Sequence, residues 1–294
     1  MSVDQESARA PVARGGARMR RAVRRGPLAV EITLGVLAFV AIIPVLWTLL
    51  LAFLPNRAIV SRSWDFPFWL GNFATLFRDD TFILQLTNSV ILVVGAVTLS
   101  LVIGSLAGYA LSKLSPPRWL VVPALVVAAF IPLVPPITLV PGLYLLLNEL
   151  GLLGTVWGLI LVNAFFNMPF AVLMLTSYFS SIPDELREAA MVDGASPWRS
   201  FVSVMLPLVR PGLAATGIYV GIMTWNEFLM GLTLTSGGAT APLTVGIAGL
   251  LQPYAVTWGE LSAAGTVAAI PIILLAVFAN RHIVAGLTTG AVKG

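Results

Sequence analysis

Six apolar stretches, each close to the length that a helix needs to cross a bilayer, constrain this chain more than any other feature. About 20 residues of helix span the hydrocarbon core of a membrane. Charged residues make up only 10% of the chain and hydrophobic residues 58%, whereas soluble domains carry about 25% charged residues. The sequence therefore predicts an all-α integral membrane protein with six transmembrane helices. They are expected at about residues 32–54, 89–112, 119–140, 155–178, 212–234 and 263–279.

The third stretch differs from the others in its prolines. Pro132, Pro135 and Pro136 lie inside it, and Pro141 follows directly. Proline has no N–H to donate, and its ring clashes with the carbonyl four residues earlier. A membrane helix tolerates such a break where neighbouring protein satisfies the freed carbonyls. We therefore expect the third helix to be kinked or broken.

Lysine and arginine are distributed unevenly between the connections, which predicts the orientation. Cytoplasmic connections of membrane proteins are enriched in these two residues. If the N-terminus lies inside, the inner segments hold fourteen of the 17 basic residues and the outer segments hold three. Both termini are therefore expected in the cytoplasm, as an Arg-rich N-terminal tail at 1–31 and a C-terminal tail at 281–294. The remaining inner segments are 113–118 and 179–211.

The arginine-rich tail by itself allows two interpretations. A basic arm can bind nucleic acid, but this one runs directly into the apolar stretch at 32–54, as a cytoplasmic flank does. That stretch is longer than the core of a signal peptide, and no small-residue cleavage pattern follows it. We therefore expect a first transmembrane helix at 32–54 and no nucleic-acid partner.

Several kinds of chemistry are excluded by what the chain lacks. It has no cysteine and a single histidine, His282, so a Cys/His metal site is not expected. It also has no Gly-x-x-x-x-Gly-Lys-[Ser/Thr] sequence, which is the phosphate-binding loop of many ATPases. We expect no catalytic residue, no bound metal and no cofactor, and the chain is not predicted to be an enzyme.

A polar passage within 179–211 is predicted to begin with a short helix. Ser181 and Asp184 have the spacing of a capping box, and Gly194 suits the left-handed residue that ends a helix. Ala189 and Ala190 leave a flat surface on it. A partner protein is able to dock there, and the alternative is a helix that lies on lipid headgroups.

A second short helix is predicted directly after the first. Ser196 is placed as its N-cap, with Pro197 in its first turn. The apolar residues that follow share one helical face, and Leu206-Pro207 is expected to end the helix before the fifth stretch. The apolar face consists of Trp198, Phe201, Val202 and Met205.

This passage resembles the EAA loop of permease subunits of binding-protein-dependent ABC importers. The residues that match at the family spacing are Glu188-Ala-Ala, Asp193-Gly194-Ala195, Phe201, Leu206-Pro207 and Pro211. Further segments resemble the smaller permease of maltose-type carbohydrate importers, and together the resemblance covers roughly residue 30 to the end. These segments are Pro141–Tyr144, Leu150–Leu152, Asn167–Phe170, Ile182–Leu186, Trp225–Leu229 and Gly286–Gly294.

The resemblance implies a type I ABC importer permease fold over residues 84–280, with the EAA loop at 179–211 as the coupling element. In that family a coupling helix sits in a cleft of a cytoplasmic ATPase. Glu188 would then pair with a basic residue of the ATPase, and Gly194 would set the turn. The expected ATPase-coupling interface consists of Glu188, Ala189, Ala190, Asp193, Gly194, Leu206 and Pro207. The tail Gly286–Gly294 would reach between the ATPase subunits, unless it is a frayed end.

The resemblance also implies partners in the bacterial cytoplasmic membrane. They are a second, related permease that forms a heterodimer with this multi-pass chain, and two ATP-binding subunits or an ATPase homodimer that bind ATP and Mg. A solute-binding protein, either periplasmic or a lipoprotein, would deliver the solute, because the longest outer segment, residues 55–88, is short for solute capture. Membrane lipid surrounds the helices.

Five polar or aromatic residues inside the apolar stretches are candidates for the translocation path. Ionisable groups in hydrocarbon are costly and often mark pathways, and Glu227 is the clear case. For Glu227 and the asparagines, the alternative is a hydrogen bond that joins helices. For the tryptophan, stacking on a sugar ring competes with ordinary packing. The candidates are Asn163, Asn167, Trp225, Asn226 and Glu227.

Together these features predict the membrane subunit of an ATP-driven importer that forms, with a second permease, the path for a sugar or oligosaccharide. Two alternatives remain. The first is an ABC permease for a peptide, phosphate or amino acid, because the EAA loop alone does not separate these solutes. The second is a secondary transporter, which would need coupling residues inside the bilayer.

Overall fold

The computed structural model describes residues 28–61, 68–114, 116–235, 238–252 and 256–290. Every regular element in these ranges is helical, apart from one isolated bridge between Leu251 and Val256. The prediction of an all-α protein is thereby confirmed. The chain divides into two units, Met1–Val45 and Leu46–Gly294. The basic tail at 1–27 lies outside the described residues.

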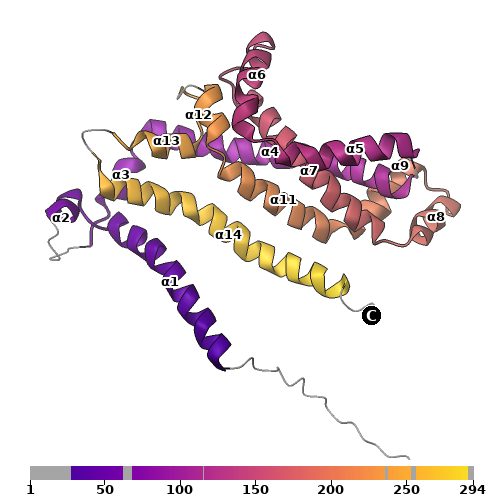
Figure 1. Cartoon of the computed structure of the whole chain (residues 1–294), viewed down its shortest axis with the longest axis horizontal. Coiled ribbons are helices and arrows are strands. Elements are labelled where there is room, and N and C mark those ends of the chain that lie inside the picture. The colour runs from indigo at the N-terminus through magenta and orange to yellow at the C-terminus, as the bar shows by residue number, and fades with distance from the viewer. Residues whose placement is uncertain (1–27, 62–67, 115, 236–237, 253–255, 291–294) are drawn as a thin grey trace, which may run out of the picture. The chain divides into compact units, whose positions relative to one another are not determined.

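The helices are labelled in Figure 1 in chain order. They are α1 (Leu28–Ala52), α2 (Asn56–Ser61), α3 (Gly71–Leu76), α4 (Asp80–Lys113), α5 (Arg118–Phe130), the 3-10 turn η1 (Ile131–Leu133), α6 (Pro136–Glu149), α7 (Val156–Ser180), α8 (Asp184–Val192), α9 (Pro197–Ser200), the π-helical turn η2 (Phe201–Met205), α10 (Leu206–Leu208), α11 (Arg210–Trp225), α12 (Leu229–Thr235), α13 (Leu243–Gly249) and α14 (Trp258–Gly290).

Four helices of the described chain are long and apolar enough to cross a membrane without a break. They are α4, α7, Val30–Ala52 of α1 and Trp258–Phe278 of α14. Two further spans are reached only if each of two bent helix pairs is counted as one, namely α5–η1 with α6, and α9–η2–α10 with α11. The described chain therefore has four to six candidate spans.

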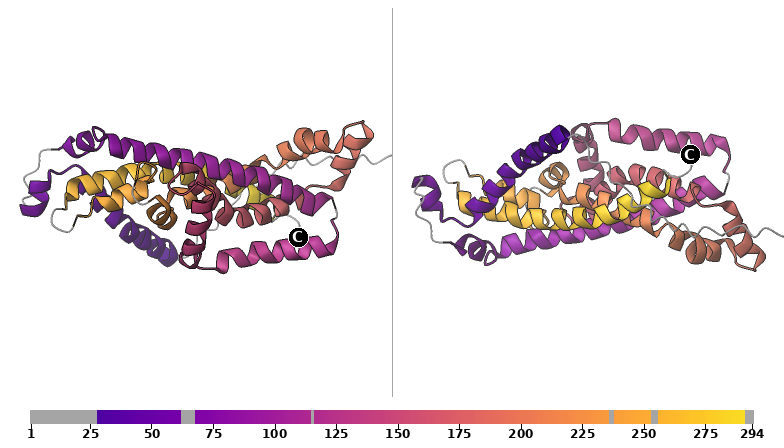
Figure 2. Two further views of the ribbon diagram at one scale, coloured as in Figure 1. Left: turned by 90° about the horizontal axis from the view of Figure 1, so that it is seen from above. Right: turned by 90° about the horizontal axis from the view of Figure 1, so that it is seen from below.

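Helices α4 and α7 form the most extensive helix pair of the second unit, and they lie side by side in Figures 1 and 2. Small buried residues recur at every fourth position of α4, namely Ala96, Ser100, Gly104 and Gly108. A Cβ on Gly108 would lie 2.9 Å from the backbone nitrogen of Thr176 on α7. Small residues let membrane helices approach to backbone contact, so this row sets the distance between the two helices.

The third apolar stretch is broken, as its prolines predict. Helix α5 and turn η1 end at Leu133, and α6 starts at Pro136 after a bend of 107°. Val134 and Pro135 have extended ψ angles of 121° and 123°, which fits the bias against helix in the residue before a proline. The predicted span at 119–140 is therefore not one helix, and α6 continues beyond the predicted end of that span to Glu149.

The fifth apolar stretch is also interrupted, which its sequence did not predict. Helix α11 ends at Trp225 and α12 begins at Leu229, so the continuous helix expected at 212–234 is wrong. The carboxylate of Glu227 bonds backbone N–H groups that the break frees in the first turn of α12, whereas the carbonyl of Ile222 still accepts from Asn226 N at 3.1 Å. Asn226 Nδ2 also donates to the carbonyl of Ile222, at 2.8 Å.

Helix α14 extends further than the sixth stretch. It continues to Gly290, so most of the predicted C-terminal tail 281–294 is helical, and 291–294 lie outside the described residues.

Candidate functional site

Helix α8 presents Glu188, Ala189 and Ala190, three of the seven predicted coupling residues, on a short exposed helix. None of its nine residues is buried. The side chain of Glu188 is 65% exposed, and its contact with Arg187 is long, at 4.0 Å. Ala189 is exposed and Ala190 is half-buried. The glutamate is therefore free to pair with a partner, next to a surface that has no bulky side chain.

The turn that ends α8 has the predicted geometry. Gly194 has a φ of +85°, in the left-handed region that glycine adopts without Cβ strain. Its N–H donates to Met191 O at 3.1 Å, and the N–H of Ala195 donates to Ala190 O at 3.0 Å. This pair of bonds is the Schellman motif. The prediction that Gly194 is the left-handed residue after the helix is confirmed, and Asp193 is the C-cap.

The start of α8 differs from the prediction. The helix begins at Asp184, after Pro183, and no side chain caps it. Ser181 instead closes the preceding helix α7, and its hydroxyl donates to Tyr178 O at 2.7 Å. The predicted capping box is therefore wrong, because Ser181 still belongs to the end of α7. The carboxylate of Asp184 has a different partner, Lys113 at the end of α4.

The second short helix starts as predicted and ends later than predicted. The hydroxyl of Ser196 accepts from Arg199 N at 3.2 Å, which confirms the N-cap. The helix then widens into turn η2, where the N–H of Leu206 donates to Phe201 O, five residues earlier. The wider turn accommodates Pro207, which has no N–H to donate. The helix breaks at Val209 with a bend of 74°, so Leu206-Pro207 does not end it.

A buried cluster joins this loop to the helical bundle. The rings of Tyr109 on α4, Phe179 on α7 and Phe201 in η2 meet, with centroid separations of 5.6 Å from Tyr109 to Phe179 and 4.8 Å from Tyr109 to Phe201. Aromatic pairs at such distances add to the stability from burial alone. Leu175, Met205 and Val209 complete the cluster. The segment that follows α8 is therefore packed on both long helices.

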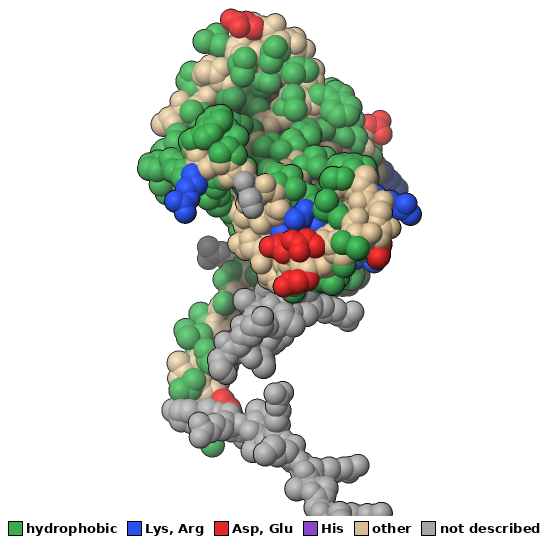
Figure 3. Space-filling model, turned by 90° about the vertical axis from the view of Figure 1, so that its right-hand side faces the viewer, with side chains coloured by type: hydrophobic (Ala, Val, Ile, Leu, Met, Phe, Trp, Pro, Cys, Tyr) green, Lys and Arg blue, Asp and Glu red, His purple; other side chains and the backbone are tan. Residues whose placement is uncertain are grey.

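Charged side chains are concentrated at the α8 end of the second unit. Figure 3 views this end, and acidic and basic side chains gather there on a face that is otherwise largely apolar. The charged residues of α8 and the turn after it are Asp184, Glu185, Arg187, Glu188 and Asp193. Such a charged end suits an aqueous surface better than hydrocarbon.

The two candidate asparagines of α7 are hydrogen-bonded inside the protein. Asn163 is buried, and its side chain donates to Leu159 O at 3.0 Å. Asn167 donates to Asn163 O at 2.8 Å and approaches the hydroxyl of Thr224 on α11 at 3.5 Å. Asn167 thus lies between α7 and α11, as the helix-joining alternative requires.

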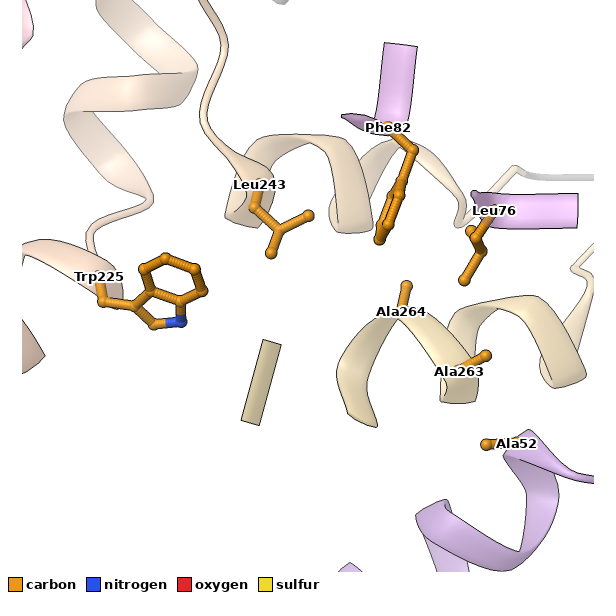
Figure 4. Packing of buried hydrophobic residues seen from close by; sticks show 7 residues of the cluster. All are labelled: Ala52, Leu76, Phe82, Trp225, Leu243, Ala263 and Ala264. Carbon is orange, nitrogen blue, oxygen red and sulfur yellow. The ribbon is translucent and has the colours of Figure 1, made fainter. Parts of the chain in front are cut away.

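Trp225 is a packing residue in this structure. Only 6% of it is exposed, and Figure 4 shows its ring pointing into a buried cluster near Leu243. Its indole N–H donates to Ala268 O on α14 at 3.0 Å. No open ring face is left for a sugar in this conformation. The structure therefore supports ordinary packing of Trp225 and does not support stacking on a sugar.

Glu227 stabilises the break between α11 and α12. Its two carboxylate oxygens accept from Met230 N at 2.6 Å and from Gly231 N at 2.9 Å. Its carbonyl accepts from the hydroxyl of Thr244 at 2.6 Å. A carboxylate at the start of a helix satisfies free N–H groups and interacts well with the helix dipole. Glu227 therefore has a local backbone partner, which neither sequence interpretation included.

Two cavities of about 610 and 640 Å³ lie in the second unit. The first is lined by Phe82, Gln85 and Phe228 among others, and the second by Arg57, Trp69 and Arg78 among others. None of the five candidates lines either cavity. Within the described ranges, no group of three or more His, Cys, Asp and Glu side chains is placed to hold a metal ion.

Comparison with known proteins identifies the family. Residues 100–289 match the model of the binding-protein-dependent transport system inner membrane component. The chain belongs to this family. The matched region begins in α4 and includes the whole α8–α11 segment, so the exposed helix α8 lies inside the part of the permease that matches the family.

Two relatives and one solved structure resemble the permease over most of its length. The trehalose transport system permease protein SugB of Mycobacterium tuberculosis is 36% identical over 86% of this chain and 93% of its own. The diacetylchitobiose uptake system permease protein NgcG of Streptomyces coelicolor is 34% identical over 86% of this chain and 85% of the NgcG chain. A chain of a bacterial ABC transporter for alginate import shares the fold, with a TM-score of 0.69, 22% identity and coverage of 86% and 94%.

Two features of the permease were missed by sequence reasoning. Lys113 was counted only as an inner basic residue, yet it bonds the first residue of α8. No local signal pairs residues 71 positions apart in sequence. The small-residue row of α4 was also missed, although its four-residue spacing was visible in the sequence.

Proposed function

We propose that the permease forms, with a second related permease, the path through which an ATP-driven importer moves a carbohydrate across the bacterial cytoplasmic membrane. Six spans place both termini in the cytoplasm. Separate ATPase subunits bind ATP and Mg, and a binding protein on the outer side, either periplasmic or a lipoprotein, delivers the sugar. The permease itself catalyses no covalent step.

The observation that carries this proposal is the construction of α8. The helix is exposed along its length and ends in a Schellman turn. The segment after it is packed on α4 and α7 through the Tyr109–Phe179–Phe201 cluster. A helix that is exposed to a partner but rigidly connected to long spans can pass a displacement to them.

The assignment of a carbohydrate is supported by the relatives. Two permeases that share more than a third of this sequence over most of its length are named for trehalose and diacetylchitobiose. Trehalose and diacetylchitobiose carry many hydroxyls and no net charge, so a path for such neutral sugars needs hydrogen-bonding groups but no fixed counter-charge. Binding to the delivery protein selects the particular sugar.

The proposed cycle uses the permease as path and lever. ATP binding closes the ATPase dimer, and α8 of each permease moves with the ATPase surface on which it is docked. Packed helices transmit such a displacement because their interfaces have discrete arrangements. The spans then rock from an inward-facing to an outward-facing state, in which the binding protein releases the sugar.

A reconstitution experiment tests this function. The permease is purified with its co-purifying subunits, placed in proteoliposomes with the binding protein, and assayed for uptake of labelled trehalose, diacetylchitobiose, a peptide and phosphate. ATP-dependent sugar uptake is expected. Uptake of only the peptide or phosphate would overturn the carbohydrate assignment, and uptake that does not need ATP would overturn the importer.

Replacement of Glu227 distinguishes a structural role from solute contact. Glu227→Ala removes the acceptors of two backbone N–H groups, and each hydrogen bond to a charged group contributes about 1.5–3 kcal/mol. We expect a lower thermal unfolding midpoint of the detergent-solubilised complex. The sugar concentration that gives half-maximal uptake should stay unchanged in the folded fraction.

Glu227→Gln is the matched variant, since it keeps one acceptor oxygen and loses the charge. Its unfolding midpoint is expected between those of the wild type and Glu227→Ala. A shifted sugar dependence with an unchanged midpoint would instead place Glu227 on the path.

A further inference from the structure

The strongest polar contact between the coupling loop and the long helices involves Lys113. This residue is the last of α4, and its side chain is only 3% exposed. Its ammonium group donates to the carbonyl of Ile182 and to Oδ1 of Asp184, each at 2.6 Å. Ile182 lies two residues before the start of α8 and Asp184 is its first residue, so one side chain of α4 holds the N-terminal end of α8 by two bonds.

This contact differs from an ordinary surface ion pair. Exposed pairs between flexible side chains contribute little to stability, partly because ordering both side chains costs entropy. Here the lysine is buried and has two acceptors, and removal of a partner would leave its charge poorly solvated. The hydrogen bond and charge of Lys113 lower the pKa of Asp184 below its ordinary value of 3.8. Aspartate is ionised at neutral pH in any case, and the lowered pKa keeps the carboxylate ionised in more acidic solution as well.

Both helix dipoles favour the pair in this orientation. The C-terminal end of a helix carries partial negative charge and the N-terminal end partial positive charge. Lys113 lies at the C-terminal end of α4, and Asp184 lies at the N-terminal end of α8. Exchanging the two charges would therefore place each beside a dipole end of the same sign, which makes a charge swap a poor test.

The position of the pair complements the packing at the other end of the loop. Helix α8 has no buried residue of its own. Its C-terminal side leads into α9 and η2, which are held by the buried cluster on α4 and α7. Its N-terminal side is held by Lys113. A helix fixed at both ends moves as one body with its support, whereas a helix fixed at one end can pivot.

From this geometry we propose that Lys113 and Asp184 are positioning residues that transmit the displacement of α8 to α4. The proposal rests on the proposed function, because it assigns a role within ATP-driven transport. Without the pair, the ATPase still moves α8, but α8 then rotates about residues 181–184 and does not displace the membrane-spanning helices.

Lys113→Met tests the proposal with little risk to folding. Methionine fills the buried space of the lysine stem without a charge, and Asp184 is left 61% exposed, where water solvates it. We expect binding-protein-stimulated ATP hydrolysis close to wild type. Sugar uptake per ATP hydrolysed should fall about tenfold, a size typical of coupling between two sites.

Three further variants separate the pair from a general charge effect. Lys113→Arg keeps a donor and a charge and should restore most of the coupling. In the double variant Lys113→Met/Asp184→Asn, sugar uptake per ATP hydrolysed should fall no further than in Lys113→Met alone, since the two groups act as one unit. Glu185→Gln is the matched control, because it removes an acidic charge at the next residue, which forms no salt bridge within the described ranges. It is expected to couple as the wild type does.

A distance measurement gives a structural readout that does not depend on transport. The chain has no cysteine, so spin labels can be attached to Leu106→Cys on α4 and Val192→Cys on α8, which are both exposed. In the assembled complex the distance distribution should be narrow, and Lys113→Met should broaden it.

The outcomes separate this inference from the proposed function. A wild-type complex without ATP-dependent sugar uptake would refute the proposed function itself. A wild-type complex that transports, together with a Lys113→Met complex of unchanged uptake per ATP and unchanged distance distribution, would refute only the role of Lys113 and Asp184. An equal fall in uptake per ATP hydrolysed in Glu185→Gln and Lys113→Met would also refute the role of Lys113 and Asp184. It would show that a change of local charge alone is enough to reduce coupling.

Discussion

Gly108→Leu is expected to prevent accumulation of folded permease in the membrane. A Cβ at this position would lie 2.9 Å from the backbone nitrogen of Thr176 and 3.0 Å from the backbone carbon of Leu175. Backbone atoms of a packed helix cannot rotate away as a side chain can, so α4 and α7 must separate along their contact. The smaller change Gly108→Ala should destabilise by about 1–3 kcal/mol, the usual cost of overpacking.

The measurement is the amount of monodisperse permease after mild detergent extraction, followed by its thermal unfolding midpoint. Gly142→Ala is the matched control, because Gly142 lies in helix α6 and nothing is within 4 Å of the added Cβ. It should keep the wild-type yield. A normal yield and midpoint for Gly108→Leu would show that the α4–α7 contact does not have the geometry described here.

Gly194→Val is expected to abolish most sugar uptake while the permease still inserts and assembles. The φ of +85° at Gly194 costs an L-residue about 1–2 kcal/mol, and a β-branched side chain is among the least tolerant of it. There is space for a Cβ at this position, so the penalty is one of backbone conformation alone. The turn would relax, α9 would leave α8 at another angle, and uptake per ATP hydrolysed should fall about tenfold or more.

Gly194→Asn is the matched control for this prediction. Asparagine adopts the left-handed conformation more readily than other non-glycine residues, so this variant should retain clearly more uptake than Gly194→Val. ATP hydrolysis and uptake are measured on the same proteoliposomes. Equal activity of the valine and asparagine variants would contradict the importance of the turn geometry.

The features that sequence predicted correctly depend on neighbours along the chain. Gly194 and Ser196 were assigned from residues within a few positions, because a C-terminal glycine and an N-cap serine bond to their own helix ends. The break in the third stretch was predicted from Pro132, Pro135 and Pro136, because a proline also acts on the helix turn next to it. The apolar stretches are local too, since each has only to match the thickness of a bilayer.

The features that sequence missed depend on residues far apart. Ser181 and Asp184 had the spacing of a capping box, but Asp184 bonds Lys113 on another helix. The fifth stretch looked continuous because hydropathy does not detect a carboxylate that accepts backbone N–H groups. Trp225 was ambiguous until its indole was seen to donate to Ala268 on α14.

For this permease the sequence by itself determined the helical class, the apolar stretches and the turn chemistry at the two ends of the α8–α9 connection. These properties follow from hydropathy and from hydrogen bonds between near neighbours in the chain. Only the tertiary structure decided how α8 is held, that the fifth stretch is interrupted, and which polar residues are already satisfied. Those outcomes depend on which helices meet, and a buried lysine or carboxylate takes whatever partner the packing brings within hydrogen-bond distance.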